Sequence, residues 1–208
     1  MSRSVKFLSL SAKLLAVLGQ ITSWGLLAPL ISQPALALPG QTVETVAAWI
    51  HTHPTLQPES GEILLVRKSD TPSRRFTFEA LTTSPGRAAS NLSGGTIRSE
   101  RISLFDTTNG VSRDRLEESL RVIYGDAIYQ DYQQSQVVYQ YPTAQMSSTA
   151  QNQATPLRES IQGEIRQGNR FAYRIETVQT RGGEAYSGQI SIFLIEDINK
   201  LEVELQSQ

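Results

Sequence analysis

The 208-residue chain contains no cysteine. This absence excludes disulfide bonds, thiol nucleophiles, thiolate metal sites and cysteine-linked lipids. A fold without disulfides must be stabilised by its hydrophobic core, and a chain of this size can build one because it buries roughly 70% of its surface on folding. The length predicts one folded domain.

Histidine is nearly absent as well, since His51 and His53 are the only two in the chain. Their segment, VETVAAWIHTHP, has helical periodicity up to Pro54, which predicts that both lie at the end of a helix. A catalytic zinc site needs three protein ligands, and no motif nominates the carboxylate that would have to be the third. A metal-binding protein or metal-dependent enzyme that uses His51, His53 and a carboxylate remains the alternative interpretation.

Sequence motifs for common enzyme chemistries are also missing. The chain has no G-x-S-x-G elbow and no glycine loop followed by a helix that would hold a phosphate. Adjacent carboxylates, such as Glu117 with Glu118, are expected on the solvated surface, whereas acid catalysis requires a buried carboxyl. The sequence therefore predicts no catalytic residue and no cofactor, and it favours a non-enzymatic protein.

The first 37 residues have the three parts of a secretory signal peptide. A basic start without acidic residues precedes an apolar run at 14–31, and Ala35 and Ala37 are the small residues at −3 and −1 of a cleavage point. An uncleaved anchor is the alternative, but the run is short for a bilayer span and contains polar residues. We expect cleavage after Ala37, and no membrane span in the mature chain.

Charge argues against one class of partner. The whole chain has 19 basic and 20 acidic residues, and the segment 1–37 carries three of the basic ones and none of the acidic ones. The mature chain therefore has a net charge of about −4, whereas general nucleic-acid binding needs a positive surface. We expect no nucleic-acid partner.

Hydrophobic periodicity predicts two helices and several strands in residues 38–208. The helices have good start and stop signals: Thr42 and Ser112 as N-caps, with Gly125 after the second helix. Helical spacing covers 42–52 and 112–124, and strand alternation covers 61–68, 74–81, 96–105, 135–141, 157–165, 171–179, 188–195 and 201–206.

This order predicts an α+β domain, with an antiparallel sheet of about six to seven strands and two helices packed on one face. Polar, glycine-bearing or uncharged stretches predict mobile loops near 82–95 and 142–156. The strand alternation is imperfect around Ser99–Arg101, which indicates a bulge.

The most unusual charge feature is RKSDTPSRR, in which Arg67, Lys68, Arg74 and Arg75 flank one turn. On a hairpin the two basic pairs come close and repel each other, a cost that an anionic partner would offset. The alternative interpretation is that these residues keep the strand ends soluble and discourage edge pairing.

Tyrosine and glutamine are concentrated between Tyr129 and Tyr141. Tyrosine is enriched at protein interfaces, so this segment is a second candidate contact surface. The alternation of Val137, Tyr139 and Tyr141 is equally typical of a structural sheet face.

The segment PALALPGQTVETVAAWIHTHP, in the first quarter of the chain, resembles the N-termini of uncharacterised exported proteins from cyanobacteria. The resemblance implies the periplasm or the thylakoid lumen and no known activity. Together with the missing chemistry, it leads us to expect an exported binding or accessory/assembly module. Its expected partner is an envelope or membrane-associated protein, or another anionic surface.

Overall fold

The computed structural model describes residues 38–85, 95–143, 160–180 and 182–207. The expected signal peptide and most of both expected mobile loops lie outside these residues. The described chain has this element order: α1 (Val43–Thr52), β1 (Leu65–Thr71), β2 (Arg74–Leu81), β3 (Ser99–Asp106), α2 (Arg113–Tyr124), α3 (Asp126–Gln134), β4 (Gln136–Tyr141), β5 (Ile161–Gln167), β6 (Ala172–Gln179), β7 (Ala185–Phe193), the 3₁₀ turn η1 (Ile195–Asp197) and α6 (Ile198–Ser207).

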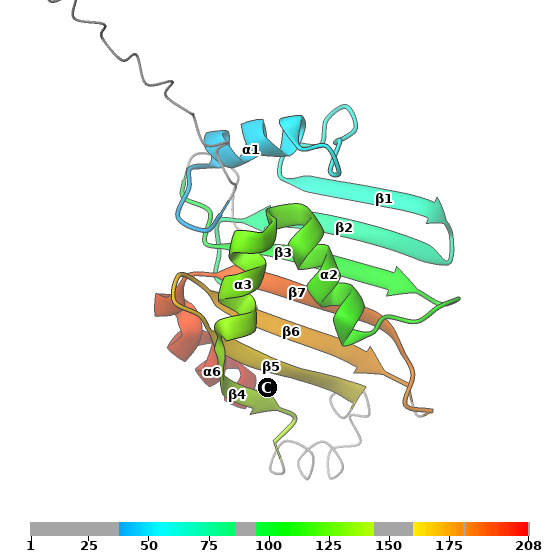
Figure 1. The fold of residues 1–208 in the computed structure, drawn as a ribbon, viewed down its shortest axis with the longest axis vertical. Coiled ribbons are helices and arrows are strands. Elements are labelled where there is room, and N and C mark those ends of the chain that lie inside the picture. The colour runs from blue at the N-terminus through cyan, green and yellow to red at the C-terminus, as the bar shows by residue number, and fades with distance from the viewer. Residues whose placement is uncertain (1–37, 86–94, 144–159, 181, 208) are drawn as a thin grey trace, which may run out of the picture. The chain divides into compact units, whose positions relative to one another are not determined.

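The seven strands form one antiparallel sheet in the order β1-β2-β3-β7-β6-β5-β4 (Figure 1). The predicted α+β class with an antiparallel sheet is therefore confirmed. Strand β7 occupies the centre of the sheet. The apolar residues on both sides of this strand predict that position, because a central strand is covered on both faces. Its pairing with β3 joins the N-terminal hairpin to the C-terminal strands.

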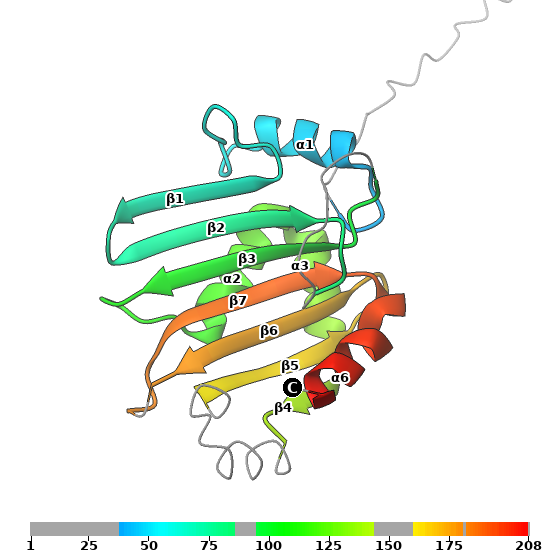
Figure 2. The ribbon, with the colours of Figure 1, turned by 180° about the vertical axis from the view of Figure 1, so that it is seen from behind.

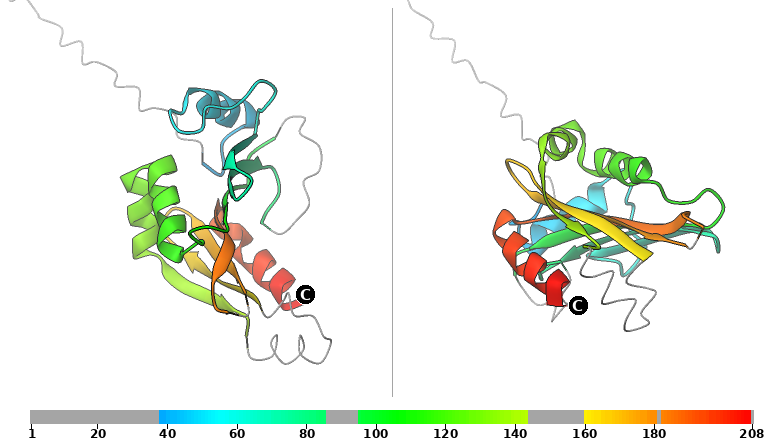
Figure 3. Two further views of the ribbon diagram at one scale, coloured as in Figure 1. Left: turned by 90° about the vertical axis from the view of Figure 1, so that its right-hand side faces the viewer. Right: turned by 90° about the horizontal axis from the view of Figure 1, so that it is seen from below.

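Helices α2 and α3 cover one face of the sheet, and α1, which lies beyond the β1 edge, adds its buried residues to the same hydrophobic core (Figures 1 and 3). Both helices expected from the sequence are among them, and their caps are as predicted. The Thr42 hydroxyl accepts a hydrogen bond from the Thr45 amide, and the Ser112 hydroxyl accepts one from the Arg115 amide, both at 3.3 Å. The third helix, α3, begins directly after Gly125, whose φ of 78° separates it from α2.

The opposite face of the sheet is covered by α6 over β4 to β7, whereas Figure 2 shows no described helix over β1 and β2. The strand expected at 201–206 is wrong, because this segment belongs to α6. Its alternation of leucine and valine imitates a strand, but Ile198, Leu201 and Leu205 form the helical stripe that packs on the sheet. Val203 is accordingly exposed by 65%.

The bulge expected around Ser99–Arg101 is also wrong, since β3 pairs with β2 without a register shift from Ser99 to Asp106. The alternation is irregular because Glu100 lies on the core face, where it is 1% exposed. One of its carboxyl oxygens accepts a hydrogen bond from the Tyr124 hydroxyl at 2.6 Å, and the other has no partner. Burial raises the pKa of Glu100 to about 7, although the Tyr124 hydrogen bond opposes the shift.

The first prediction concerns Glu100 and pH. The folded state keeps the Glu100 proton up to about pH 7, whereas the unfolded chain releases it near 4.5. This group therefore contributes stability that is complete below pH 4.5 and is lost as the pH rises through 7. Urea unfolding at pH 5 and pH 8 should show wild type losing up to about 3 kcal/mol more than Glu100→Gln.

Glu59→Gln is the matched control, because Glu59 is exposed and its replacement should leave the pH dependence of the wild type unchanged. Parallel curves of unfolding free energy against pH for Glu100→Gln and wild type would contradict the assignment.

Candidate functional site

His51 and His53 lie at the end of α1, as the sequence predicts. His51 is exposed in the last turn, whereas the His53 ring connects the helix end to the rest of the protein through hydrogen bonds. Its Nδ1 accepts hydrogen bonds from the amides of Thr55 and Leu56, so its Nε2 carries the proton and donates to the Ile123 carbonyl at 3.0 Å.

Burial lowers the pKa of His53, which favours the neutral ring, although the bond to Ile123 opposes this. Both ring nitrogens of His53 are thus occupied by the backbone. In the described part of the chain, no three histidine or acidic side chains gather in a way that could hold a metal ion. The sequence alternative of a site built from His51, His53 and a carboxylate receives no third ligand from these residues.

The four basic residues of the hairpin are divided between the two faces of the sheet. Lys68 and Arg74 point toward the helix-covered face. Lys68 pairs with Phe76, which packs against the core, and Arg74 is two residues before Phe76 on the same strand, so it shares that face. The Lys68 ammonium donates to the Thr55 carbonyl at 2.7 Å, and Arg74 Nε lies 3.5 Å from Asp106 Oδ2. These two cations are therefore engaged within the protein.

Arg67 and Arg75 lie on the opposite face, and neither guanidinium has a carboxylate partner among the described residues. Arg75 lies over the Phe105 ring, with its guanidinium carbon 4.5 Å from the ring centroid. A guanidinium held flat on an aromatic ring keeps its N–H edges free for an acceptor. The Phe105 ring thus orients Arg75, and neither arginine is neutralised by a carboxylate of the described chain.

These two arginines border a cavity of about 510 Å³, which we call the hairpin cavity. Its wall includes Thr77 of β2, Ser103 of β3 and Ser187 of β7. The three hydroxyls have no hydrogen-bond partner in the described structure. No acidic residue of the described chain lines the cavity, which therefore presents hydrogen-bond donors and positive charge without a carboxylate that would neutralise it.

Sequence reasoning found Arg67 and Arg75 but missed Phe105 and the hydroxyl wall. Ser103 and Ser187 are far apart in the sequence and meet only because β3 pairs with β7, where Phe105 is the partner of Ser187. A serine on the polar face of a strand carries no signal of its own. The β3–β7 pairing cannot be predicted from local periodicity, so no sequence pattern indicated that these residues lie together.

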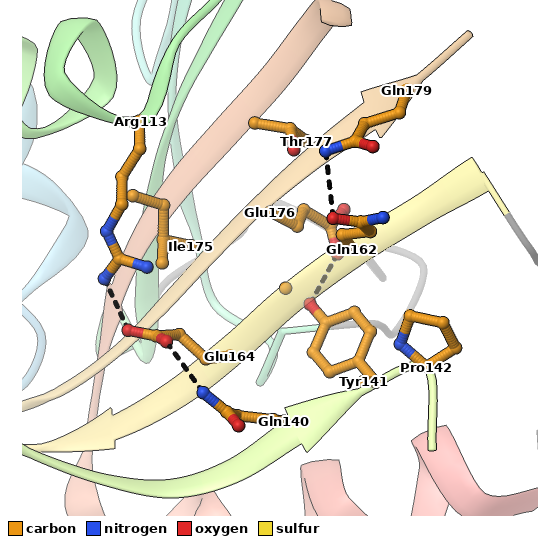
Figure 4. A pocket seen from close by; sticks show the side chains of 11 residues that line it. Arg113, Gln140, Tyr141, Pro142, Gln162, Glu164, Ile175, Glu176, Thr177 and Gln179 are labelled. Carbon is orange, nitrogen blue, oxygen red and sulfur yellow. Dashed lines mark hydrogen bonds and ion pairs between the residues drawn. The ribbon is translucent and has the colours of Figure 1, made fainter. Parts of the chain in front are cut away.

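A second cavity, of about 570 Å³, lies between the N-terminus of α2 and strands β4, β5 and β6 (Figure 4). Its charged groups neutralise one another. Glu164 accepts hydrogen bonds from Arg113 and from Arg166, and Arg113 also donates to Glu117 at 2.8 Å. Burial opposes ionisation of Glu164, but the two arginines outweigh it and lower its pKa to about 2.

The far wall of this second cavity is satisfied internally as well. The Gln179 amide donates to the Gln162 carbonyl at 2.9 Å, and the Tyr141 hydroxyl donates to Glu176 at 2.7 Å (Figure 4). The Tyr141 ring reaches Glu176 by crossing over Gly163, where a side chain would collide with it. The second cavity is thus bounded by a closed polar network, unlike the hairpin cavity.

No family model matches the chain, and neither the curated proteins nor the solved structures contain a match. None of the described helices is long and apolar enough to cross a bilayer. Function therefore has to be inferred from the chemistry of the described side chains.

The second prediction concerns the crossing of Tyr141 over Gly163. A Cβ at residue 163 would lie 2.5 Å from the Tyr141 ring and 2.7 Å from the Ile175 carbonyl oxygen, so Gly163→Ala must displace the ring or the strand. We expect a loss of about 2 kcal/mol in the free energy of unfolding, measured by urea titration.

Gly182→Ala is the matched control, because a Cβ there meets nothing closer than the Thr180 hydroxyl at 3.7 Å. Equal stability of the two variants would contradict this prediction, because it would show that the Tyr141 ring and the strands move to accommodate the added Cβ without a loss of stability.

Proposed function

We propose that the protein is an exported, non-enzymatic binding or accessory module that recognises an anionic group through the hairpin cavity. The signal-like N-terminus supports export to the periplasm or the thylakoid lumen. An envelope or membrane-associated protein, or another anionic surface, supplies the group that is bound.

A single observation carries this proposal: among the described residues, Arg67 and Arg75 have no carboxylate partner and lie beside three hydroxyls without a hydrogen-bond partner. Elsewhere in the described chain the arginines of the sheet are paired, such as Arg101 with Glu79 and Arg174 with Glu176. Two guanidiniums without a carboxylate partner repel each other, and a bound anion would remove that repulsion. In a chain of negative net charge, we take such a pair to be a recognition feature.

The donors of the hairpin cavity define the ligand chemistry. Two guanidiniums and three hydroxyls can together supply more hydrogen bonds than the two oxygens of a single carboxylate accept. A phosphate group has more acceptor oxygens and the geometry that a guanidinium fork matches. The favoured ligand is therefore a phosphate-bearing molecule or surface.

The groups that line the hairpin cavity support binding rather than a reaction. No imidazole or carboxylate of the described chain belongs to its wall, so neither a general base nor a partner for a hydroxyl nucleophile is present. The ammonium of Lys68 is held by the Thr55 carbonyl. The lining thus supplies charge and hydrogen bonds but no group suited to proton transfer.

The third prediction tests this site with inorganic phosphate as the probe. In a ¹⁵N NMR titration of the purified protein, amides of residues 67–69, 75–77, 103–105 and 187 should shift. Arg67→Gln and Arg75→Gln should each weaken phosphate binding about tenfold, because each removes one charge-assisted contact. A parallel arm compares sedimentation with phosphatidylglycerol and phosphatidylcholine vesicles, which separates a lipid headgroup from free phosphate.

Arg170→Gln is the matched control, since Arg170 also lies over an aromatic ring, that of Phe171 at 5.5 Å, but outside the hairpin cavity. It should bind phosphate as the wild type does. Equal affinities of Arg75→Gln and wild type, or shifts confined to other residues, would overturn the proposal.

A further inference from the structure

The face of the sheet opposite α2 and α3 carries polar side chains beyond the hairpin cavity. Alternate residues of a strand share a face, so Glu79 lies on the same face as Thr77. Glu79 pairs with Arg101 of β3, and Gln189 of β7 pairs with Ser103. Figure 2 shows no described helix over β2 or β3 on this side. We call Glu79, Arg101 and Gln189 the polar extension.

The polar extension is next to the hydroxyl wall of the hairpin cavity. Neighbouring strands of a sheet lie about 4.8 Å apart, and residues two positions apart on one strand are separated by roughly 7 Å. Gln189 is one strand away from Ser103, and Glu79 is two positions along β2 from Thr77. A molecule that extends less than about 10 Å from a phosphate in the hairpin cavity can therefore contact the polar extension.

The side chains of the polar extension are held in place and keep free hydrogen-bonding atoms. Arg101 donates to one carboxylate oxygen of Glu79, and the other oxygen has no hydrogen-bond partner among the described residues. The Gln189 amide donates to Glu176, whereas its carbonyl oxygen has no hydrogen-bond partner in the same part of the chain. Glu176 is itself fixed, because it also accepts a hydrogen bond from the Tyr141 hydroxyl at 2.7 Å. The polar extension is thus oriented before any ligand binds.

The polar extension is partly exposed and carries no net charge. The side chains of Arg101 and Glu79 are exposed by 34% and 28%, and Gln189 is partly exposed as well. Because the two charges cancel, this surface provides hydrogen-bond donors and acceptors rather than a site for a second anion. Hydroxyls match closely spaced donors and acceptors, since each hydroxyl both donates and accepts.

A peptide is a poorer match for this surface. Extended peptides are usually recognised at a sheet edge, where they bond to unpaired backbone groups. Strands β2, β3 and β7 each have a neighbouring strand on both sides, so their backbones are already paired and only side chains face a ligand. The chemistry therefore favours a small hydroxylated group over a polypeptide.

Building on the anion binding proposed above, we propose that the ligand of the hairpin cavity is a phosphate ester of a sugar or another polyol. Its phosphate lies beside Arg67 and Arg75, and its hydroxyls bind to the polar extension. The arginines thus provide the charge, and the polar extension selects what is attached to the phosphate. Such esters occur both as soluble molecules and as lipid headgroups, and the chemistry that they share is a phosphate with hydroxyls close to it.

The fourth prediction compares two phosphate esters of equal charge in a ¹⁵N NMR titration of the purified protein. Glucose 6-phosphate carries several hydroxyls, whereas ethyl phosphate carries none beyond its phosphate. Glucose 6-phosphate should bind at least about tenfold more tightly, because it adds hydrogen bonds at the polar extension. Amides of residues 79, 101 and 189 should shift with glucose 6-phosphate only, whereas amides of residues 75–77 should shift with both esters.

Two variants test the polar extension itself. Gln189→Ala and Glu79→Ala should each lower the affinity for glucose 6-phosphate about threefold to tenfold, because each removes an acceptor for a ligand hydroxyl. Titration of the same variants with ethyl phosphate checks that they are folded and that the hairpin cavity still binds. Gln133→Ala is the matched control, since Gln133 is an exposed glutamine on α3, at the other face of the sheet, and it should keep the wild-type preference.

Vesicles of phosphatidylglycerol, whose headgroup is a glycerol phosphate, distinguish a lipid from a soluble ester. If a lipid headgroup is the natural ligand, Gln189→Ala should sediment with these vesicles less than the wild type does. Equal sedimentation, together with a weaker affinity for glucose 6-phosphate, assigns the polar extension to a soluble ester.

The results distinguish a failure of the polar extension from a failure of the hairpin cavity. Equal affinities of the wild type for the two esters would overturn the role of the polar extension and leave anion binding intact. A preference for glucose 6-phosphate that both Gln189→Ala and Glu79→Ala retain would place the sugar elsewhere and overturn it too. No binding of either ester would overturn anion binding at the hairpin cavity, and the polar extension with it.

Discussion

The pairing of β3 with β7 is the contact on which the rest of the structure depends. It joins two groups of strands, β1 to β3 and β4 to β7, that are separated in the chain by α2 and α3. It also gives one hydrophobic core to residues from both groups, such as Ile102 and Ile190. The same pairing sets Phe105 beside Ser187, so the hairpin cavity exists only when the two halves are correctly registered.

Strand alternation then decides which charges are free. Because neighbouring residues point to opposite faces, each basic pair of the hairpin is divided, and one member of each lies on the helix-covered side. That side supplies acceptors, the Thr55 carbonyl for Lys68 and the Asp106 carboxylate for Arg74. In the described chain, the open side supplies no carboxylate to Arg67 or Arg75. Four charges that look equivalent in the sequence therefore have two different roles.

Much of the fold could be predicted from the sequence, because its signals are local. The capping residues Thr42 and Ser112 and the strand alternation gave the two long helices and the α+β class. The failures came where tertiary burial overrides a local pattern. The buried Glu100 on the core face imitated a bulge, and the segment 201–206 alternated like a strand although Leu201 and Leu205 also fit a helix. The hydroxyls of the hairpin cavity could not be predicted, because partners distant in the sequence define them.

Among the described residues, unpaired polar groups occur both inside the core and at the hairpin cavity, and their access to solvent decides what they mean. The free oxygen of Glu100 is inside the core, where the missing hydrogen bond costs stability and favours the neutral acid. The hydroxyls of the hairpin cavity are within reach of water, which satisfies them at little cost. Exchanging that water for a partner costs little when the partner restores each bond. A polar group without a partner therefore lowers stability within the core, whereas at the boundary of the core it marks a recognition surface. The polar groups of the cavity beside Arg113 already bond to one another, so this cavity is the weaker candidate for a binding site, although it is larger than the hairpin cavity.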